Sequence, residues 1–152
     1  MSNIQIAMYK GDGKIGNAVT RYWTRSQYSH CELVIDGVCR SSSFMDGGVR
    51  SKVIDLEDGK WELVGIPWGD EKNILQFFDF TKGSGYDWAG IFGSQLLNRR
   101  FQNPHRFFCS EWVAAALSLP TPEIHSPQSL LSLCQYLNVK YERDGYARTS
   151  SI

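Results

Sequence analysis

The chain has 152 residues, of which 42% are hydrophobic and 13% aromatic. This is enough apolar side chain to close one core, so we expect a single domain spanning residues 1–152. Lys plus Arg number 16, as do Asp plus Glu, and this balance excludes a strong overall field that would attract nucleic acid or an anionic membrane.

The beginning of the chain, MSNIQIAMYKGDG, lacks the basic start and long apolar run of an export signal. No stretch reaches the roughly 20 apolar residues of a membrane span, so we expect no integral membrane segment and synthesis in the cytoplasm. The cysteines, none of them in a C-x-x-C pair, are expected to remain free thiols in a reducing compartment. They are Cys31, Cys39, Cys109 and Cys134.

The first half of the chain predicts strands. IQIAMY at 4–9 is typical of a strand, and IGNAVTRYWTR at 15–25 is typical of a short helix with one apolar face. Asp36-Gly37 lies between two β-rich runs, which predicts a hairpin with a two-residue turn. A turn at 46–49 and strands at 51–56 and 60–68 are expected to follow.

The hairpin turn also predicts which residues share a face. If Ile35 pairs with Val38, residues facing each other can be counted back along both strands. The pairs on one face are then Val34 with Cys39, Glu32 with Ser41, and His30 with Ser43. The opposite face receives Cys31, Leu33 and Ile35.

The second half predicts helices. They are expected at 70–83, capped by Asp70 and stopped at Gly83; at 86–97; from Cys109 to near Pro120; and at 126–137, with Ser126 as N-cap and Pro127 at the first position. We expect a short strand at 139–144 and a flexible polar tail at 143–152. Strands followed by helices predict an α+β fold in which an antiparallel β-sheet packs against helices.

The segment RFFCSEWVAAAL places a cysteine where aromatic residues give way to a helix-forming run. Ser110 and Glu111 favour a first helical turn, which puts Cys109 at or next to the N-cap. Unpaired backbone N–H groups and the positive end of the helix dipole favour a thiolate there. The alternative is that Cys109 is a small hydrophobic residue packed under its aromatic neighbours.

A thiol hydrolase or transferase needs an imidazole within hydrogen-bond reach of the thiolate and a polar group that orients the ring. His30 begins a strand on its polar face, where Ser43, Glu32 or Ser41 is in position to orient it. Backbone N–H groups of Cys109 and Ser110 are candidates for an oxyanion hole, worth roughly 3 kcal/mol per donor in known systems. The alternative is an ordinary strand histidine that bonds to solvent.

These residues resemble a known family. YSHCELVIDG, followed by YDWAGI, FFCSEWVAAAL and HSPQSLLSL, is similar to the circularly permuted branch of the NlpC-type papain-like superfamily. That branch includes YiiX-like hydrolases and, more distantly, lecithin:retinol acyltransferase-like proteins. The resemblance spans about residues 4 to 137 and rests on the order of histidine strand before cysteine helix.

The resemblance implies that Cys109 is the nucleophile and His30 the base. It puts the third position on the following strand, at Ser41, Ser42 or Ser43, where relatives often have Glu, His or Gln. Glu32 or Asp46 is the alternative third member. In the YDWAGI segment, Trp88 stands where unpermuted enzymes have their cysteine.

The resemblance also implies the reaction and its substrates. It implies a hydrolase acting on an amide or ester, as a thiol protease, cysteine peptidase or amidase, or an acyltransferase, with no cofactor. Its substrates would be a peptide, a peptidoglycan fragment or an acyl lipid. A cell-wall role would need delivery by lysis or a virion, as for a phage or prophage protein. The alternative from another class is a catalytically inactive papain-like binding domain, which a third position made only of serines favours.

The sequence offers two further candidate sites. GDGKIG at 11–16 matches the glycine pattern of dinucleotide-binding loops, with Asp36 as the acidic partner, but Asp36 already serves a hairpin turn. A zinc site would combine His105 and Cys109, four residues apart, with His30 and Cys31. Pro104 disfavours the helix that this spacing requires. We expect His125 on a surface loop.

Overall fold

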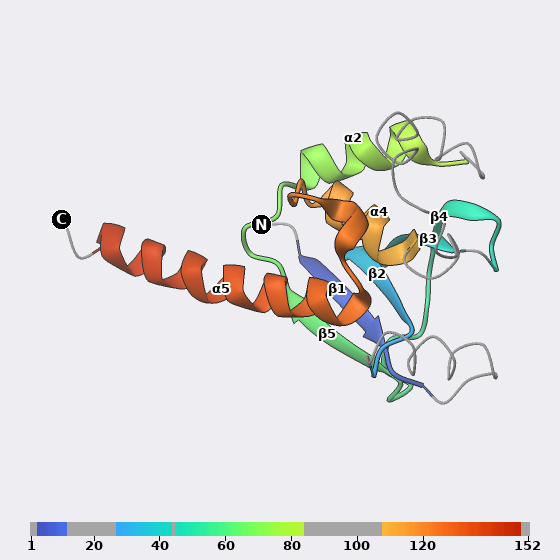
Figure 1. The fold of residues 1–152 in the computed structure, drawn as a ribbon, viewed down its shortest axis with the longest axis horizontal. Coiled ribbons are helices and arrows are strands. Elements are labelled where there is room, and N and C mark those ends of the chain that lie inside the picture. Colours follow the sequence, from blue (N-terminus) through green and yellow to red (C-terminus); the bar gives the residue numbers. More distant parts are fainter. Residues whose placement is uncertain (1–2, 12–26, 44, 84–107, 150–152) are drawn as a thin grey trace.

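The computed structural model describes residues 3–11, 27–43, 45–83 and 108–149, and the structural statements below concern these ranges. Their strands form one antiparallel sheet in the order β4-β3-β2-β1-β5 (Figure 1). The strands are β1 Ile4–Tyr9, β2 His30–Ile35, β3 Val38–Ser43, β4 Gly48–Lys52 and β5 Trp61–Gly65. The α+β class and the antiparallel sheet are confirmed.

The β2–β3 hairpin has the predicted turn, and the predicted register holds next to it; the strand pairs end at Leu33–Arg40, so the predicted pairs Glu32–Ser41 and His30–Ser43 are not among them. Asp36 and Gly37 adopt φ angles of 50° and 78°, the left-handed conformation that a two-residue turn of this kind requires at both positions. Ile35 pairs with Val38, and Val34 with Cys39. The local turn chemistry therefore sets the pairing of the two strands from which the candidate site is built.

The helices follow the strands in the chain. They are α2 Glu71–Thr81, α4 Phe108–Ala116 and α5 Pro127–Thr149, with a short 3₁₀ helix at Pro122–Ile124. Asp70 caps α2 by accepting a hydrogen bond from the Asn73 N–H at 3.1 Å, and Ser126 accepts one from the Ser129 N–H at 3.2 Å. Both predicted caps are confirmed.

Helix α4 lies against one face of the sheet and carries the centre of the core. Trp112 is fully buried, and its indole N–H donates to the Thr81 hydroxyl of α2 at 3.0 Å. The strand residues of this core include Cys31, Leu33 and Ile35, which confirms their predicted common face. Helix α5 starts at the core and its C-terminal half extends away from it (Figure 1).

The other face of the sheet has a smaller apolar cluster. Buried Ala7, Val34 and Cys39 pack there beneath Leu56 and Trp61. The polar end of this same face, beyond Val34 toward the start of β2, holds the charged residues described below. The sheet thus separates a helix-covered core from a face that is partly polar.

Several expectations were wrong. The strand predicted at 51–56 starts earlier, because the turn closes by Gly47 and Gly48 already pairs with Ser43. Residues 139–144 are not a strand; they continue α5, since Lys, Glu and Arg propagate a helix already begun. The predicted tail also begins inside α5. The predicted helices at 15–25 and 86–97 lie outside the described residues.

In the described part of the chain, no helix combines the length and apolar character needed to cross a membrane.

Candidate functional site

Cys109 lies in the first turn of α4, at the second helical residue, where its thiol is buried with 7% exposure. The predicted position next to the N-cap is therefore off by about one residue, which still leaves the backbone N–H of Cys109 among those without a carbonyl partner inside the helix. The thiol belongs to the core cluster that also contains Cys31 of β2.

His30 is the first residue of β2 and its side chain is 25% exposed. Its ring interacts with Cys109, and its Nε2 lies 2.7 Å from Oε1 of Glu32. Because a carboxylate only accepts, Nε2 is the donor in this bond. The edge of Trp61 covers the ring from the side, at 6.4 Å between centroids. The structure thus brings Cys109, His30 and Glu32 together.

The two partners ionise in opposite directions. A hydrogen bond from Cys31 is the main cause that lowers the pKa of Cys109 well below its usual range, against burial, and the charge of His30 adds to it. Burial acts to lower the pKa of His30, but the charge and hydrogen bond of Cys109 and the contact with Glu32 raise it to about 10. Both shifts favour a thiolate beside an imidazolium over a neutral pair.

Cys31 is a neighbour of Cys109 that the sequence suggested only as a zinc ligand. It is fully buried, and its pKa is raised well above the usual range, mainly by burial and then by its contact with Cys109. It therefore remains a thiol and donates its S–H toward the sulfur of Cys109. The sequence shows that Cys31 follows His30, but its contact with Cys109 depends on how α4 packs on β2.

Glu32 is the predicted third-member candidate that contacts the ring. Its side chain has 0% exposure. It also accepts hydrogen bonds from both terminal nitrogens of Arg50, at 2.6 and 2.7 Å. Burial raises its pKa, but the hydrogen bonds from His30 and Arg50 outweigh burial and hold that pKa below its usual range. Glu32 is thus a buried carboxylate that stays ionised.

The other third-member candidates have different surroundings. Ser41 donates its hydroxyl to the carbonyl of Cys31 at 2.8 Å, while the Ser42 hydroxyl is buried without a hydrogen-bond partner. Ser43 pairs with Gly48 at the end of β3. Asp46 accepts a hydrogen bond from Nε of Arg50 at 2.7 Å. It is therefore linked to Glu32 through Arg50.

Ser110 and His125 fix the start of α4 to the loop before α5. The Ser110 hydroxyl donates to the carbonyl of His125 at 2.6 Å. His125 is 8% exposed and its Nε2 lies 3.2 Å from the carbonyl of Pro120. The expectation of a surface histidine was wrong, because this loop packs over the helix start.

Neither alternative site gains support. The described strands pair only antiparallel, whereas a dinucleotide-binding fold requires parallel strands with helical crossovers. Of the glycine motif only Gly11 is described. Among the described residues, no group of three or more His, Cys, Asp or Glu side chains is arranged to hold a metal; His105 lies outside them.

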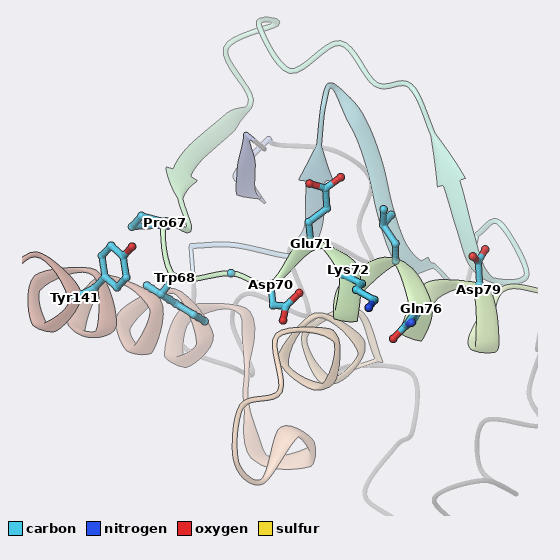
Figure 2. A pocket seen from close by; sticks show the side chains of 10 residues that line it. Pro67, Trp68, Asp70, Glu71, Lys72, Gln76, Asp79 and Tyr141 are labelled. Atoms are coloured by element: carbon cyan, nitrogen blue, oxygen red, sulfur yellow. The ribbon is translucent and has the colours of Figure 1, made fainter. Parts of the chain in front are cut away.

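A groove of about 850 Å³ lies elsewhere, between the chain at 67–72, helix α2 and Tyr141 of α5 (Figure 2). Cys109 and His30 are not among its lining residues. Its carboxylates include Asp70, which caps α2, and Asp79, which pairs with Lys82 at 2.6 Å. These two acids thus have local structural partners.

Comparison of the chain with protein-family models, with curated proteins and with solved structures finds no match.

Proposed function

We propose that the protein is a thiol-dependent hydrolase or acyltransferase, with Cys109 as nucleophile, His30 as general base and acid, and Glu32 as the group that orients the imidazole. One observation carries the proposal: the His30 ring contacts the buried Glu32 carboxylate at 2.7 Å and also interacts with Cys109. This is the set of groups that covalent thiol catalysis requires.

The reaction follows from these groups. The thiolate of Cys109 attacks the carbonyl carbon of an amide or ester, and the carbonyl electrons move onto oxygen. The N–H of Cys109 and the positive end of α4 favour this oxyanion. Its collapse breaks the bond to the leaving group, which takes the proton from the His30 imidazolium. A thioester on Cys109 remains.

The second half of the reaction restores the enzyme. His30, now neutral, removes a proton from water as the water attacks the thioester carbonyl. Collapse releases the acid and returns Cys109 as a thiolate beside an imidazolium. If an amine or alcohol attacks instead of water, the same steps transfer the acyl group.

Glu32 favours the enzyme over an inactive binding domain. The hypothesis of an inactive binding domain rested on a third position made only of serines, since a serine orients an imidazole less firmly than a carboxylate does. Glu32 provides that carboxylate from the histidine strand itself, 2.7 Å from Nε2.

The order of elements supports a permuted papain-like fold. Strand β2, with His30 at its start, precedes helix α4, with Cys109 in its first turn, and the helix packs on an antiparallel sheet. On this proposal the substrate presents an amide or ester carbonyl, as in a peptide, a peptidoglycan fragment or an acyl lipid.

A chromogenic ester tests the proposal without knowledge of the natural substrate. With p-nitrophenyl acetate in excess, we expect a burst of p-nitrophenolate equal in amount to the protein, and mass spectrometry should find the acetyl group on Cys109. Cys109→Ala should remove the burst, whereas Cys134→Ala, a matched buried cysteine, should retain it. Acetylation spread over lysines, unaffected by Cys109→Ala, would refute the proposal.

A further inference from the structure

The contacts of the candidate site continue beyond Glu32 to Arg50 of β4. Two terminal nitrogens of Arg50 donate to the two oxygens of Glu32 at 2.6 and 2.7 Å, and its Nε donates to Asp46 at 2.7 Å. Side-chain exposure is 0% for Glu32, 16% for Arg50 and 29% for Asp46. The guanidinium is thus held between two carboxylates, one buried and one at the surface.

We propose that Arg50 is a positioning residue for the thiol chemistry, because its bidentate contact with the Glu32 carboxylate holds that group in place beside His30. This inference rests on the proposed function and assigns a further residue to that site. Arg50 touches neither sulfur nor ring in this role; it acts through Glu32.

Glu32 needs such a partner for its charge. A carboxylate removed from water is costly unless it is paired and hydrogen-bonded on both oxygens. His30 contacts only Oε1, so without Arg50 the second oxygen would lack a donor and the carboxylate would be free to turn or take up a proton. The planar guanidinium matches both oxygens at once, which an ammonium group does not.

The charges along these contacts alternate. They run from the thiolate of Cys109 through the His30 imidazolium, the Glu32 carboxylate and the Arg50 guanidinium to Asp46. Because Arg50 shares the charge of Glu32, it keeps the local field from becoming strongly negative, which would disfavour the thiolate.

Strand register explains how Arg50 reaches Glu32 across an intervening strand. Arg50 pairs with Ser41 of β3, and Ser41 follows Arg40, the β3 residue that pairs with Leu33 next to Glu32. The small Ser41 side chain turns toward the Cys31 carbonyl. Two long side chains are thereby able to meet over it.

The pH dependence of Cys109 alkylation by iodoacetamide tests this role on the full chain. In Arg50→Gln we expect the acid limb of the rate profile to move up by about one pH unit, slowing alkylation on that limb by about 3-fold. Arg50→Lys keeps the positive charge but not the bidentate contact, so the acid limb should move less in this variant than in Arg50→Gln. Arg40→Gln is the matched control, since Arg40 lies over Phe78 at 5.5 Å and should leave the profile unchanged.

Asp46→Asn provides a variant that leaves the Arg50–Glu32 contact in place. Because it removes a negative charge next to Arg50, we expect a smaller shift in the opposite direction. If Arg50→Gln does not fold, the acid limbs of Arg50→Lys and Asp46→Asn decide whether Arg50 acts on the ionisation of Cys109. A lower melting temperature with an unmoved acid limb would make Arg50 purely structural and overturn the inference alone. A wild-type protein whose Cys109 shows no alkylation at acidic pH would overturn the proposed function as well.

Discussion

Two buried cysteines of the same core behave in opposite ways. Cys109 and Cys134 both lie on helices and both belong to the core cluster. Burial raises the pKa of Cys134 to about 12, whereas the pKa of Cys109 is well below its usual range in spite of burial, through the Cys31 hydrogen bond and the charge of His30. Burial alone therefore makes a thiol inert.

The position on the helix accounts for part of the difference. Cys134 lies in the interior of α5, where backbone N–H groups are used within the helix, while Cys109 lies in the first turn of α4. The other part comes from β2, which supplies the imidazole and the thiol donor from adjacent positions. A reactive Cys109 thiol therefore depends on the packing of the start of α4 against the start of β2.

The largest expected effect is the selectivity between the two thiols. At about pH 7 iodoacetamide should alkylate Cys109 at least about 100-fold faster than Cys134, because only the first is ionised. The Cys109 rate should rise with pH and level off well below pH 9, and the ion pair should be lost as His30 deprotonates near pH 10. Timed alkylation followed by peptide mass spectrometry measures both; equal, slow labelling of all four cysteines would refute the comparison.

Removing the imidazole should make Cys109 resemble Cys134. In His30→Ala the sulfur loses a neighbouring positive charge, a change that shifts a pKa by about 1–3 units. For a rise of about two units the thiolate fraction on the acid limb falls roughly 100-fold while greater nucleophilicity restores roughly 10-fold, so alkylation should slow about 10-fold. His125→Ala is the matched control, because His125 is also buried but contacts the Pro120 carbonyl. An undiminished rate in His30→Ala would assign the ionisation of Cys109 to the Cys31 thiol and the helix start instead.

Local signals predicted the elements that carry this pair. The Asp36-Gly37 turn gave the register of β2 and β3 because a two-residue turn leaves little freedom in the strands it joins. The helix after Cys109 was predicted from first-turn residues. Histidine strand and cysteine helix could thus be recognised, since each is encoded within a few residues.

Contacts that depend on packing were not predictable. Arg50 was missed because the strand was expected only from Ser51, after a turn at 46–49; the observed start at Gly48 puts Arg50 opposite Ser41. The contact between Cys31 and Cys109 required knowing how α4 rests on the sheet. The buried state of His125 likewise has no local signal, because it follows from a loop folding over α4.

A smaller effect should come from the thiol donor. In Cys31→Ala the sulfur of Cys109 loses a hydrogen bond to its charged form, which is worth about 1.4 kcal/mol if it moves the pKa by about one unit. On the acid limb alkylation of Cys109 should then slow about 3-fold. Cys39→Ala is the control, because Cys39 lies in the cluster on the other face of the sheet. Equal effects of both substitutions would show that Cys31 acts only through packing.

The smallest effect should come from Glu111, which follows Cys109 on α4. Burial, then the negative charge of Cys109, then that of Glu123 raise the pKa of Glu111 to about 7. As pH rises through this value, a new negative charge makes the nearby thiolate more basic, so its alkylation should quicken by less than about 2-fold. Glu111→Gln should remove this step and leave the acid limb in place, because Glu111 is already neutral there. A step that persists in the Gln variant would assign it to another group near the thiolate and would leave the contrast with Cys134 independent of Glu111.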